Sequence, residues 1–237
     1  DGAEIAAEVM RMALLAPKDG KPSIAIGTGE PESDNMVYGY DYDSDGTYKQ
    51  KHYLKIEGTD TWDHPDTAKP LKDVQQGTKY LRSIGVLPRY AMMNSTTFDY
   101  LVENEQIKNA LITSSGKTVD FTDEATVKEI FTRKTGLTPI IYDKMYIDYK
   151  GKTQKFYPDD KVTIIGAGTL GSTYYGVTPE ERTLMSNKNV DVAMLDNRIA
   201  IATKTEQGPP IKTTTSVSQI VLPSYEGIDS TFVLDVK

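Results

Sequence analysis

The chain has 237 residues, with 27 Lys and Arg against 34 Asp and Glu, which gives a formal net charge of −7. This acidic balance argues against an extended nucleic-acid or anionic-membrane footprint and leaves room only for a local basic patch. The absence of cysteine excludes thiol nucleophiles, thiolate metal sites and disulfides.

No apolar run reaches the roughly 20 residues of a membrane span, and no signal peptide opens the chain. We therefore expect no membrane partner. The chain begins Asp-Gly rather than Met, from which we expect a processed or trimmed product that lacks an N-terminal segment.

The first predicted elements are a helix and a long arm of strands. Residues 3–15 carry apolar side chains at helical spacing, and Pro17 follows. We then expect three strands joined by turns rich in Gly, Pro and acidic residues: 23–26, 36–42 and 47–56. Tyrosines with few aliphatic neighbours dominate this arm, residues 21–57. We therefore expect it to pack on a surface outside its own domain, between subunits.

Residues 67–113 predict a helix, a strand and a second helix in succession. Pro70 suits a first helical position, and apolar residues recur at helical spacing as far as Ile84. Gly85 ends that helix, and residues 89–93 follow as a strand. Asn94 or Ser95 can then cap the second helix, whose predicted inward residues are Phe98, Leu101 and Val102.

The second half of the chain predicts one more long helix and many short strands. The helix covers residues 123–135, with Thr122 as its cap and Gly136 after its end. The strands at 139–142, 145–149, 154–157 and 162–165, with a turn at Lys150-Gly151, predict an antiparallel sheet. A brief helix at 179–182 and four further strands follow, at 190–194, 198–203, 217–222 and 232–236. Helices mixed with hairpin-linked strands favour the α+β class.

The most conspicuous motif is KVTIIGAGTLG, residues 161–171, where a strand leads into Gly166, Gly168 and Gly171 at the spacing of a dinucleotide-binding turn. In such a turn, a following helix holds the phosphates at its N-terminus. Here Gly176 and Pro179 would interrupt that helix, and the remaining residues predict strands. We favour a loop joining strands. The alternative is a nucleotide-dependent oxidoreductase.

An acidic turn, DYDSDG at residues 41–46, places Asp41, Asp43 and Asp45 as in the first half of a calcium loop. Position twelve would be His52 instead of Glu, and the flanks predict strands rather than helices. We therefore predict a solvated hairpin tip without a tight calcium site.

Acid–base chemistry has few candidates, because the only histidines are His52 and His64. Asp63 and His64 could form a base with its orienting carboxylate, but no G-x-S-x-G elbow supplies a nucleophile for a hydrolase. We expect no catalytic, metal or cofactor site, and hence no enzyme.

In the order of its elements, the chain resembles the major capsid proteins of tailed bacteriophages, particularly the phage lambda head-protein (capsid E) family with its Hong Kong 97-type fold. The resemblance covers most of the chain, starting with the first helix and the arm. It rests on four further stretches: TWDHPDTAKPLKDVQQ, PRYAMMNSTTFDYLVENEQIKNAL, FYPDDKVTIIGAGTLGSTYYGVTPEE and VLPSYEGIDSTFVLDV.

The resemblance implies a layout of domains. Residues 1–20 would be the first helix of a peripheral domain, and 21–65 an extended loop. Residues 66–93 would be the spine helix and a peripheral strand, 94–205 an apical domain, and 206–237 returning strands. From the resemblance we expect that the N-terminal arm, which the family carries before this helix, is lacking here.

The resemblance also implies a function: a structural subunit that self-assembles, as pentamers and hexamers, into the icosahedral head of a bacteriophage or prophage around double-stranded DNA. Its partners would be itself, scaffolding, portal and decoration proteins, and non-specifically contacted DNA. It would be assembled in the bacterial host cytoplasm and located in the virion. Two alternatives are an encapsulin-like compartment and an adhesin or tail module, of which the latter would lack the long helix.

Overall fold

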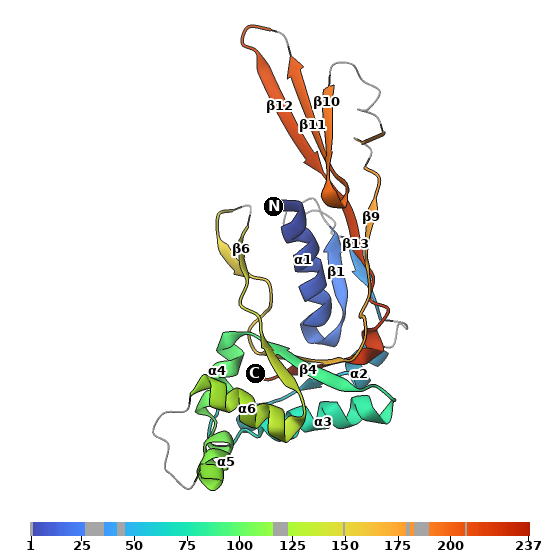
Figure 1. Cartoon of the computed structure of the whole chain (residues 1–237). Helices are drawn as coiled ribbons and strands as arrows, with labels where there is room; N and C mark the ends of the chain where they lie inside the picture. The colour runs from blue at the N-terminus through green and yellow to red at the C-terminus, as the bar shows by residue number, and fades with distance from the viewer. Residues whose placement is uncertain are drawn as a thin grey trace. The chain divides into compact units, whose positions relative to one another are not determined.

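The computed structural model of the chain describes residues 2–26, 36–41, 46–115, 123–148, 150–178, 181–182, 190–206 and 208–237 (Figure 1). The chain forms two compact units, one of Asp1–Met10 with Gly171–Glu226 and the other of Arg11–Leu170 with Gly227–Lys237. These units differ from the expected domains, because residues 94–170 belong with the predicted spine helix rather than with 171–205.

The larger unit is built on a five-stranded mixed sheet. Its strand order is β3 (Tyr53–Lys55), β14 (Thr231–Asp235), β8 (Lys161–Gly166), β4 (Pro88–Met93) and β5 (Thr138–Ile141). The strand β8 is antiparallel to both of its neighbours, whereas β3 runs parallel to β14 and β5 parallel to β4. Two of the four pairings therefore join parallel strands.

The prediction that residues 139–165 form one antiparallel sheet is wrong. The strand β5 is parallel to β4, because the helices between them supply the long crossover that a parallel pair needs. The strands β6 (Met145–Ile147) and β7 (Thr153–Lys155) instead form a separate antiparallel hairpin. Gly151 has φ 76° in its turn, at the predicted Lys150-Gly151 position.

Four helices cover one face of this sheet (Figure 1): α3 (Pro70–Ser83), α4 (Ser95–Glu103), α5 (Glu105–Ser115) and α6 (Glu124–Thr135). Their inward residues share one core with alternate residues of the strands: Val74, Leu81, Phe98, Leu101, Val127 and Phe131 from the helices, and Ala91, Met93, Ile164, Phe232 and Leu234 from the sheet. This shared core explains why α3 and α4–α6 are one unit.

The caps of these helices agree with the sequence. Pro70 is the first residue of α3, and the side chain of Asn94 accepts a hydrogen bond from Thr97 N at the start of α4. Gly136 ends α6 with φ 77°. The predicted second helix is divided at Asn104, whose side-chain oxygen accepts from Gln106 N at 3.0 Å and so caps α5. The expected cap Thr122 lies outside the described residues, and Asp123 occupies the N-cap of α6.

The other face of the sheet packs on the end of α1 (Gly2–Leu15). Met12 and Ala16 form a small core with Met92 and Tyr157. The hydroxyl of Thr163 in β8 donates to Leu15 O at 2.6 Å. The helices α3–α6 cover one face of the sheet and the end of α1 packs on the other. This is why most residues of the central strands are apolar.

The predicted arm is shorter than expected. The strands β1 (Ser23–Ile26) and β2 (Met36–Gly39) do form an antiparallel ribbon, whose connecting residues 27–35 lie outside the described part of the chain. The third predicted strand, 47–56, is wrong. Its first half is the helix α2 (Thr47–Lys51), and its second half is β3 in the core sheet.

The reason is burial. Tyr48 is only 3% exposed, and its hydroxyl lies 2.9 Å from Thr231 Oγ1 of β14. Tertiary packing of this tyrosine outweighs the strand propensity of the segment.

The smaller unit consists mainly of strands. In it β9 (Thr173–Gly176) pairs with β13 (Ile220–Pro223), and a three-stranded antiparallel sheet contains β10 (Val190–Leu195), β11 (Ile199–Glu206) and β12 (Lys212–Ser218). The single strand predicted at 217–222 is divided between β12 and β13. In the predicted helix 179–182, only 181–182 are described, and both are helical.

Among the described residues, short 3₁₀ turns occur at Lys18–Gly20, Gly58–Asp60, Asp196–Arg198 and Ile228–Ser230. Within the described ranges, no helix is both long and apolar enough to cross a membrane. The predicted α+β class is confirmed by this mixture of helices and sheets.

Candidate functional site

The glycine motif ends a strand and begins another strand. Gly166 is the last residue of β8, Gly168 has φ 119°, and the chain continues after Gly171 into β9. The strand β9 pairs antiparallel with β13. No helix N-terminus therefore follows the glycines to hold a pyrophosphate group, as the sequence predicted.

Close packing explains two of these glycines. A Cβ on Gly166 would lie 2.5 Å from Val86 Cγ1, and one on Gly171 would lie 2.3 Å from Ser224 O. Both distances are far below van der Waals contact. Gly168 has open space around it but a left-handed backbone, which L-residues rarely adopt.

The acidic turn is only partly described, because Asp43 and Asp45 lie outside the described residues. Both carboxylate oxygens of Asp41 lie 3.3 Å from Tyr48 N, in the first turn of α2. Gly46, the N-cap of α2, has no side chain of its own to cap the helix. Asp41 therefore caps a helix terminus, and the flank that follows the turn is a helix rather than the predicted strand.

His52 is a buried structural residue. Its Nδ1 lies 2.8 Å from Thr231 O and its Nε2 3.3 Å from the hydroxyl of Tyr80. Its ring stacks on that of Tyr48 at a centroid distance of 5.2 Å. These contacts join α2 to β14 and α3, and with 4% exposure the imidazole is closed to a substrate.

The predicted Asp63-His64 pair exists, but its geometry is not that of a catalytic triad. The carboxylate of Asp63 lies 3.1 Å from His64 Nδ1, and the hydroxyl of Thr61 lies 2.9 Å from the same nitrogen. In a triad, the nucleophile and the carboxylate contact opposite nitrogens of the imidazole. Thr61 also donates to Gly58 O at 3.1 Å, so the group forms a local turn.

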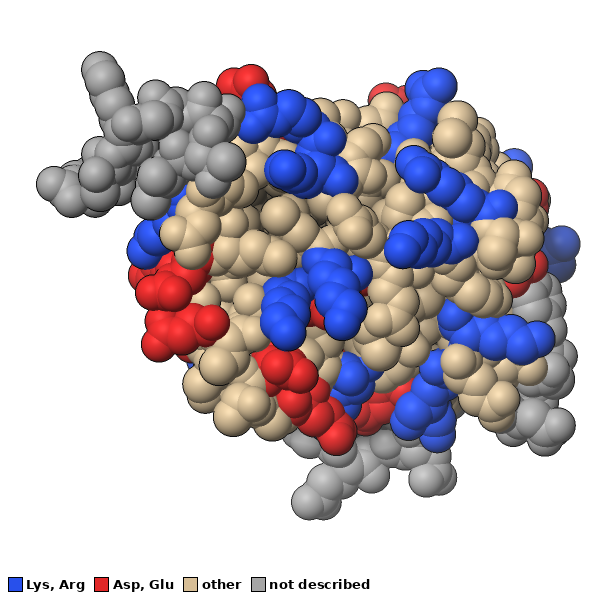
Figure 2. Space-filling model, turned by 90° about the horizontal axis from the view of Figure 1, so that it is seen from below, with Lys and Arg blue, Asp and Glu red and all other residues tan. Residues whose placement is uncertain are grey.

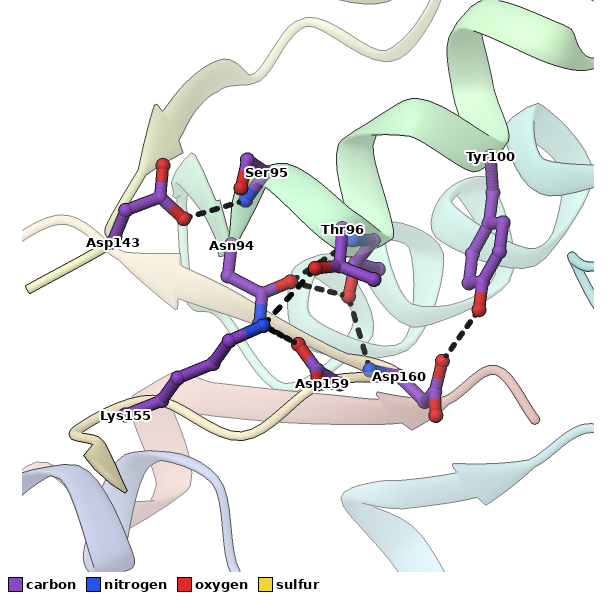
Figure 3. Close-up of polar contacts among 9 residues, drawn as sticks. Asn94, Ser95, Thr96, Tyr100, Asp143, Lys155, Asp159 and Asp160 are labelled. Atoms are coloured by element: carbon purple, nitrogen blue, oxygen red, sulfur yellow. Dashed lines mark hydrogen bonds and ion pairs between the residues drawn. The ribbon is translucent and has the colours of Figure 1, made fainter. Parts of the chain in front are cut away.

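A polar network fixes the start of α4, as Figure 3 shows. Asp159 Oδ1 accepts from Asn94 Nδ2 at 2.5 Å and from Lys155 Nζ at 2.6 Å. Asp143 Oδ1 accepts from Ser95 N at 2.8 Å. Burial works to raise the pKa of Asp159, but its hydrogen bonds to Lys155 and Asn94 hold that pKa below its usual value.

A second arm of the same network leads further along α4. Asp160 N donates to Thr97 Oγ1 at 3.0 Å, and Asp160 Oδ1 accepts from the hydroxyl of Tyr100 at 2.9 Å. Burial, together with Asp160, raises the pKa of Tyr100. Asp143, Asp159 and Asp160 each accept a hydrogen bond from a protein group (Figure 3). The network therefore holds both the β5–β6 turn and the β7–β8 turn against α4.

A buried ion pair lies at the edge of the core sheet. Lys161 Nζ contacts Asp235 Oδ2, and each side chain is 12% exposed. The hydroxyl of Tyr53 donates to the same oxygen at 2.6 Å, and Lys161 Nζ lies 5.3 Å from the centre of the Tyr53 ring. Burial, with the Asp235 carboxylate, raises the pKa of Tyr53. The three groups satisfy one another across β3, β14 and β8.

The described part of the chain holds no cluster of His, Asp or Glu side chains that could bind a metal ion. A shallow depression on the surface of α6 and β5 is lined by Lys128, Glu129, Thr132, Arg133, Thr138 and Pro139. It contains no nucleophile paired with a base.

The exposed apolar side chains of the smaller unit were not predicted from the sequence. Val217 in β12 is 60% exposed, Leu195 in β10 is 54% exposed, and Ile211 before β12 is 73% exposed. The sequence of β12, KTTTSVS at residues 212–218, indicates this exposure. Its one large apolar residue is Val217, so the strand has few apolar side chains to pack against those of the neighbouring strand.

The family model described as phage major capsid protein E matches residues 5–209. Among solved structures, the chain is similar to the candidate capsid protein of a prophage of Escherichia coli CFT073. Their TM-score is 0.63 with 14% identity, over 100% of this chain and 64% of that chain. The chain thus spans less than two thirds of that protein's length. At this identity the similarity shows a shared fold.

A second structure, a phage-related protein from Bordetella bronchiseptica RB50, has a TM-score of 0.47 and 13% identity over 80% of this chain and 56% of that chain. This likeness is too weak to carry an argument. No curated protein matches the chain.

The family model covers well over half of the 237 residues. The α+β architecture and the similar prophage structure are consistent with the Hong Kong 97-type fold that the resemblance implied. The chain belongs to the phage major capsid protein E family.

Proposed function

We propose that this chain is part of the structural shell subunit of a phage or prophage head, and that it self-assembles through sheet surfaces that the single copy leaves exposed. Family membership supports the shell role. Assembly into pentamers and hexamers in the host cytoplasm, around DNA and with scaffolding and portal partners, is part of the same proposal.

The observation that carries this proposal is one face of the β10–β11–β12 sheet. The strand register places Ala193, Ile201 and Val217 side by side on that face, with Leu195 in the next row beside Ile199, which is itself buried at 8% exposure. Val217 and Leu195 are more than half exposed. A sheet of three strands needs an apolar face that is covered, and contiguous exposed apolar side chains mark protein interaction sites.

A second copy of the chain is the partner that fits this face. Members of a capsid family are packed against copies of themselves, so an identical subunit is always available at high local concentration. In the described part of the chain, β12 pairs only with β11. Its free edge adds unpaired backbone groups to the apolar face, and a neighbouring strand could bind there.

Two ribbons of the larger unit have the same character. In the β6–β7 hairpin, Met145 is 55% and Ile147 is 67% exposed. In the β1–β2 ribbon, Val37 is 65% exposed. We assign the intersubunit role of the extended loop to Ser23–Gly39 instead of residues 21–65, because Tyr48 and β3 belong to the core.

The test replaces Val217 by Lys and compares it with Thr214→Lys as a matched control. The two residues lie on opposite faces of β12, since Val217 pairs with Ile201 and Thr214 with Lys204. Both changes add one charge to an exposed position of the same strand. Val217→Lys should leave the melting temperature unchanged but abolish shells and higher oligomers in sedimentation and electron microscopy, whereas Thr214→Lys should still assemble.

Equal assembly of both variants would show that this face is not an interface between copies. An unmodified chain that stays monomeric at every concentration would contradict self-assembly altogether.

A further inference from the structure

Figure 2 shows the underside of the molecule, the side on which α3 and α6 lie in Figure 1. Lys and Arg side chains spread over this face, while Asp and Glu lie mainly toward its edges. Five exposed residues define what we name the basic face: Lys72, Lys79 and Arg82 on α3, and Arg133 and Lys134 on α6. The basic face belongs to a chain whose net charge is −7, so the charge is segregated.

Two contacts bring the two helices together. Gln75 Nε2 donates to Lys134 O at 3.2 Å, which joins the middle of α3 to the last turn of α6. The guanidinium of Arg82 lies over Gly136, with Nη2 3.7 Å from the position that a Cβ there would take. The five cations therefore form one surface although they come from segments about 50 residues apart in the sequence.

Acidic residues are few among these cations: Glu129 lies one turn before Arg133 on α6, and Asp73 follows Lys72 on α3. No Asp or Glu occurs in residues 74–98 or 130–142, which contain four of the five. The one acid on α3, Asp73, accepts the indole N–H of Trp62 at 3.0 Å and is turned toward the core. None of the five cations forms an ion pair with another residue of the described chain. Their charge is therefore available to an external anion.

Helix stabilisation explains only part of this pattern. Arg82, Arg133 and Lys134 occupy last helical turns, where a cation complements the helix macrodipole. Lys79 lies before the last turn of α3. Lys72 lies in the first turn, where a cation opposes the dipole. The two lysines therefore need another reason.

The composition of the surface distinguishes between two kinds of partner. Protein interfaces have an apolar core and are depleted in Lys. No large apolar side chain is exposed among the described residues of α3 and α6, and the nearest ones, Ile84 and Leu87, follow the end of α3. Between the cations lie neutral hydrogen-bonding groups, Gln76, Ser83 and Thr132, as at surfaces that bind phosphate groups.

We propose that the basic face of α3 and α6 binds the phosphate backbone of double-stranded DNA without sequence specificity. The inference rests on the proposed function, since a shell around packaged DNA presents one of its faces to a dense array of phosphates. It goes further by assigning that contact to five residues. Neutralising phosphates releases counterions from the duplex, which gives the binding a steep dependence on salt.

The test measures binding of a fluorescein-labelled DNA duplex by anisotropy over a series of salt concentrations. The first variant combines Lys72→Gln, Lys79→Gln and Arg82→Gln. A second, independent variant combines Arg133→Gln and Lys134→Gln on the other helix. The matched control for the first is Lys18→Gln with Lys152→Gln and Lys212→Gln, which removes three exposed charges outside the basic face. Fluorescence of Trp62 verifies that each variant is folded.

We expect the first variant to bind at least tenfold more weakly than the control. The salt slope should fall by about one for each phosphate that a replaced cation had neutralised. The second variant should bind more weakly in the same direction. The inference fails if the unmodified chain does not bind duplex at low salt, if the control weakens binding equally, or if anionic vesicles bind in preference to DNA. It also fails if the variants lose self-association but bind DNA as tightly as the unmodified chain. That result would show that the basic face contacts a neighbouring copy.

Assembly is measured separately, in sedimentation without DNA. A chain that assembles but does not bind duplex contradicts this inference and leaves the shell role intact. A chain that binds duplex through these residues but never assembles contradicts the shell role alone.

Discussion

Replacing Gly166 by Ala tests whether the conspicuous glycine motif serves packing. The new Cβ would lie 2.5 Å from Val86 Cγ1 and 3.1 Å from Ser230 O. Carbon atoms in contact lie roughly 3.5–4.0 Å apart, so the first contact overlaps by about 1 Å. Overpacking of this size costs about 1–3 kcal/mol of unfolding free energy. Gly166 is part of the strand β8 and has no left-handed φ, so no strain adds to this cost.

The second change, Val86→Ala, removes the atom that the new Cβ meets. Val86 is half-buried against the core, so its truncation alone should cost about 1 kcal/mol. In the double variant the two side chains no longer compete for one space. We expect the double variant to be more stable than the sum of the single effects predicts, by about 1–2 kcal/mol.

Urea unfolding followed by the fluorescence of Trp62 measures this coupling. Trp62 is the sole tryptophan and is 1% exposed, in the same compact unit as Gly166 and Val86. Strictly additive effects would refute the packing explanation. Saturable binding of NAD or ATP that disappears in Gly166→Ala would revive a nucleotide site.

Two further predictions concern buried charges. Burial raises the pKa of Asp73, although the hydrogen bond from Trp62 opposes this shift. Because the folded state holds this proton more tightly than the unfolded state does, the free energy of unfolding falls as pH rises through the raised pKa and Asp73 ionises. Asp73→Asn keeps an acceptor for the indole but removes the ionising group. The stability of this variant relative to the unmodified chain should therefore rise as pH increases from about 3 to about 7. A fall in this relative stability would contradict the raised pKa. Lys161→Met leaves Asp235 buried without its cation and should cost about 3–5 kcal/mol in urea unfolding. Adding Asp235→Asn should recover most of this stability, and no recovery would show that the pairing is unimportant.

Local signals predicted the helices well. Pro70 at the start of α3, Asn94 at the cap of α4 and Gly136 at the end of α6 act through backbone groups within a few residues, so the sequence alone is sufficient to identify them. The polar network at α4 was not predicted. Asp159 reaches Asn94 only because β4 and β8 are neighbours in the sheet.

The features of the fold that the sequence did not predict depend on contacts between segments far apart in the chain. The parallel pairs of β3 with β14 and β4 with β5 join distant segments, and no local pattern encodes such partners. The helix α2 was missed for the same reason, since Tyr48 is buried by β14 near the other end of the chain. Deleting residues 32–51 as a test of the predicted arm would therefore remove α2 with the buried Tyr48, which is part of the core. A clean test of the ribbon must stop before α2.

The charge pattern shows why a net charge is a weak guide to the partners of this chain. A value of −7 argued against an extended nucleic-acid footprint, and that argument holds for the average surface. Residues 74–98 and 130–142 lack acids but are far apart in the sequence, and neither alone carries enough cations to be noticed. The fold places α3 beside α6 on one face of a sheet, and the two weak biases then add on one surface. Electrostatic attraction acts over roughly 10 Å at moderate salt, so a polyanion at that face responds to the local charges, in which cations predominate, more than to acids elsewhere on the chain.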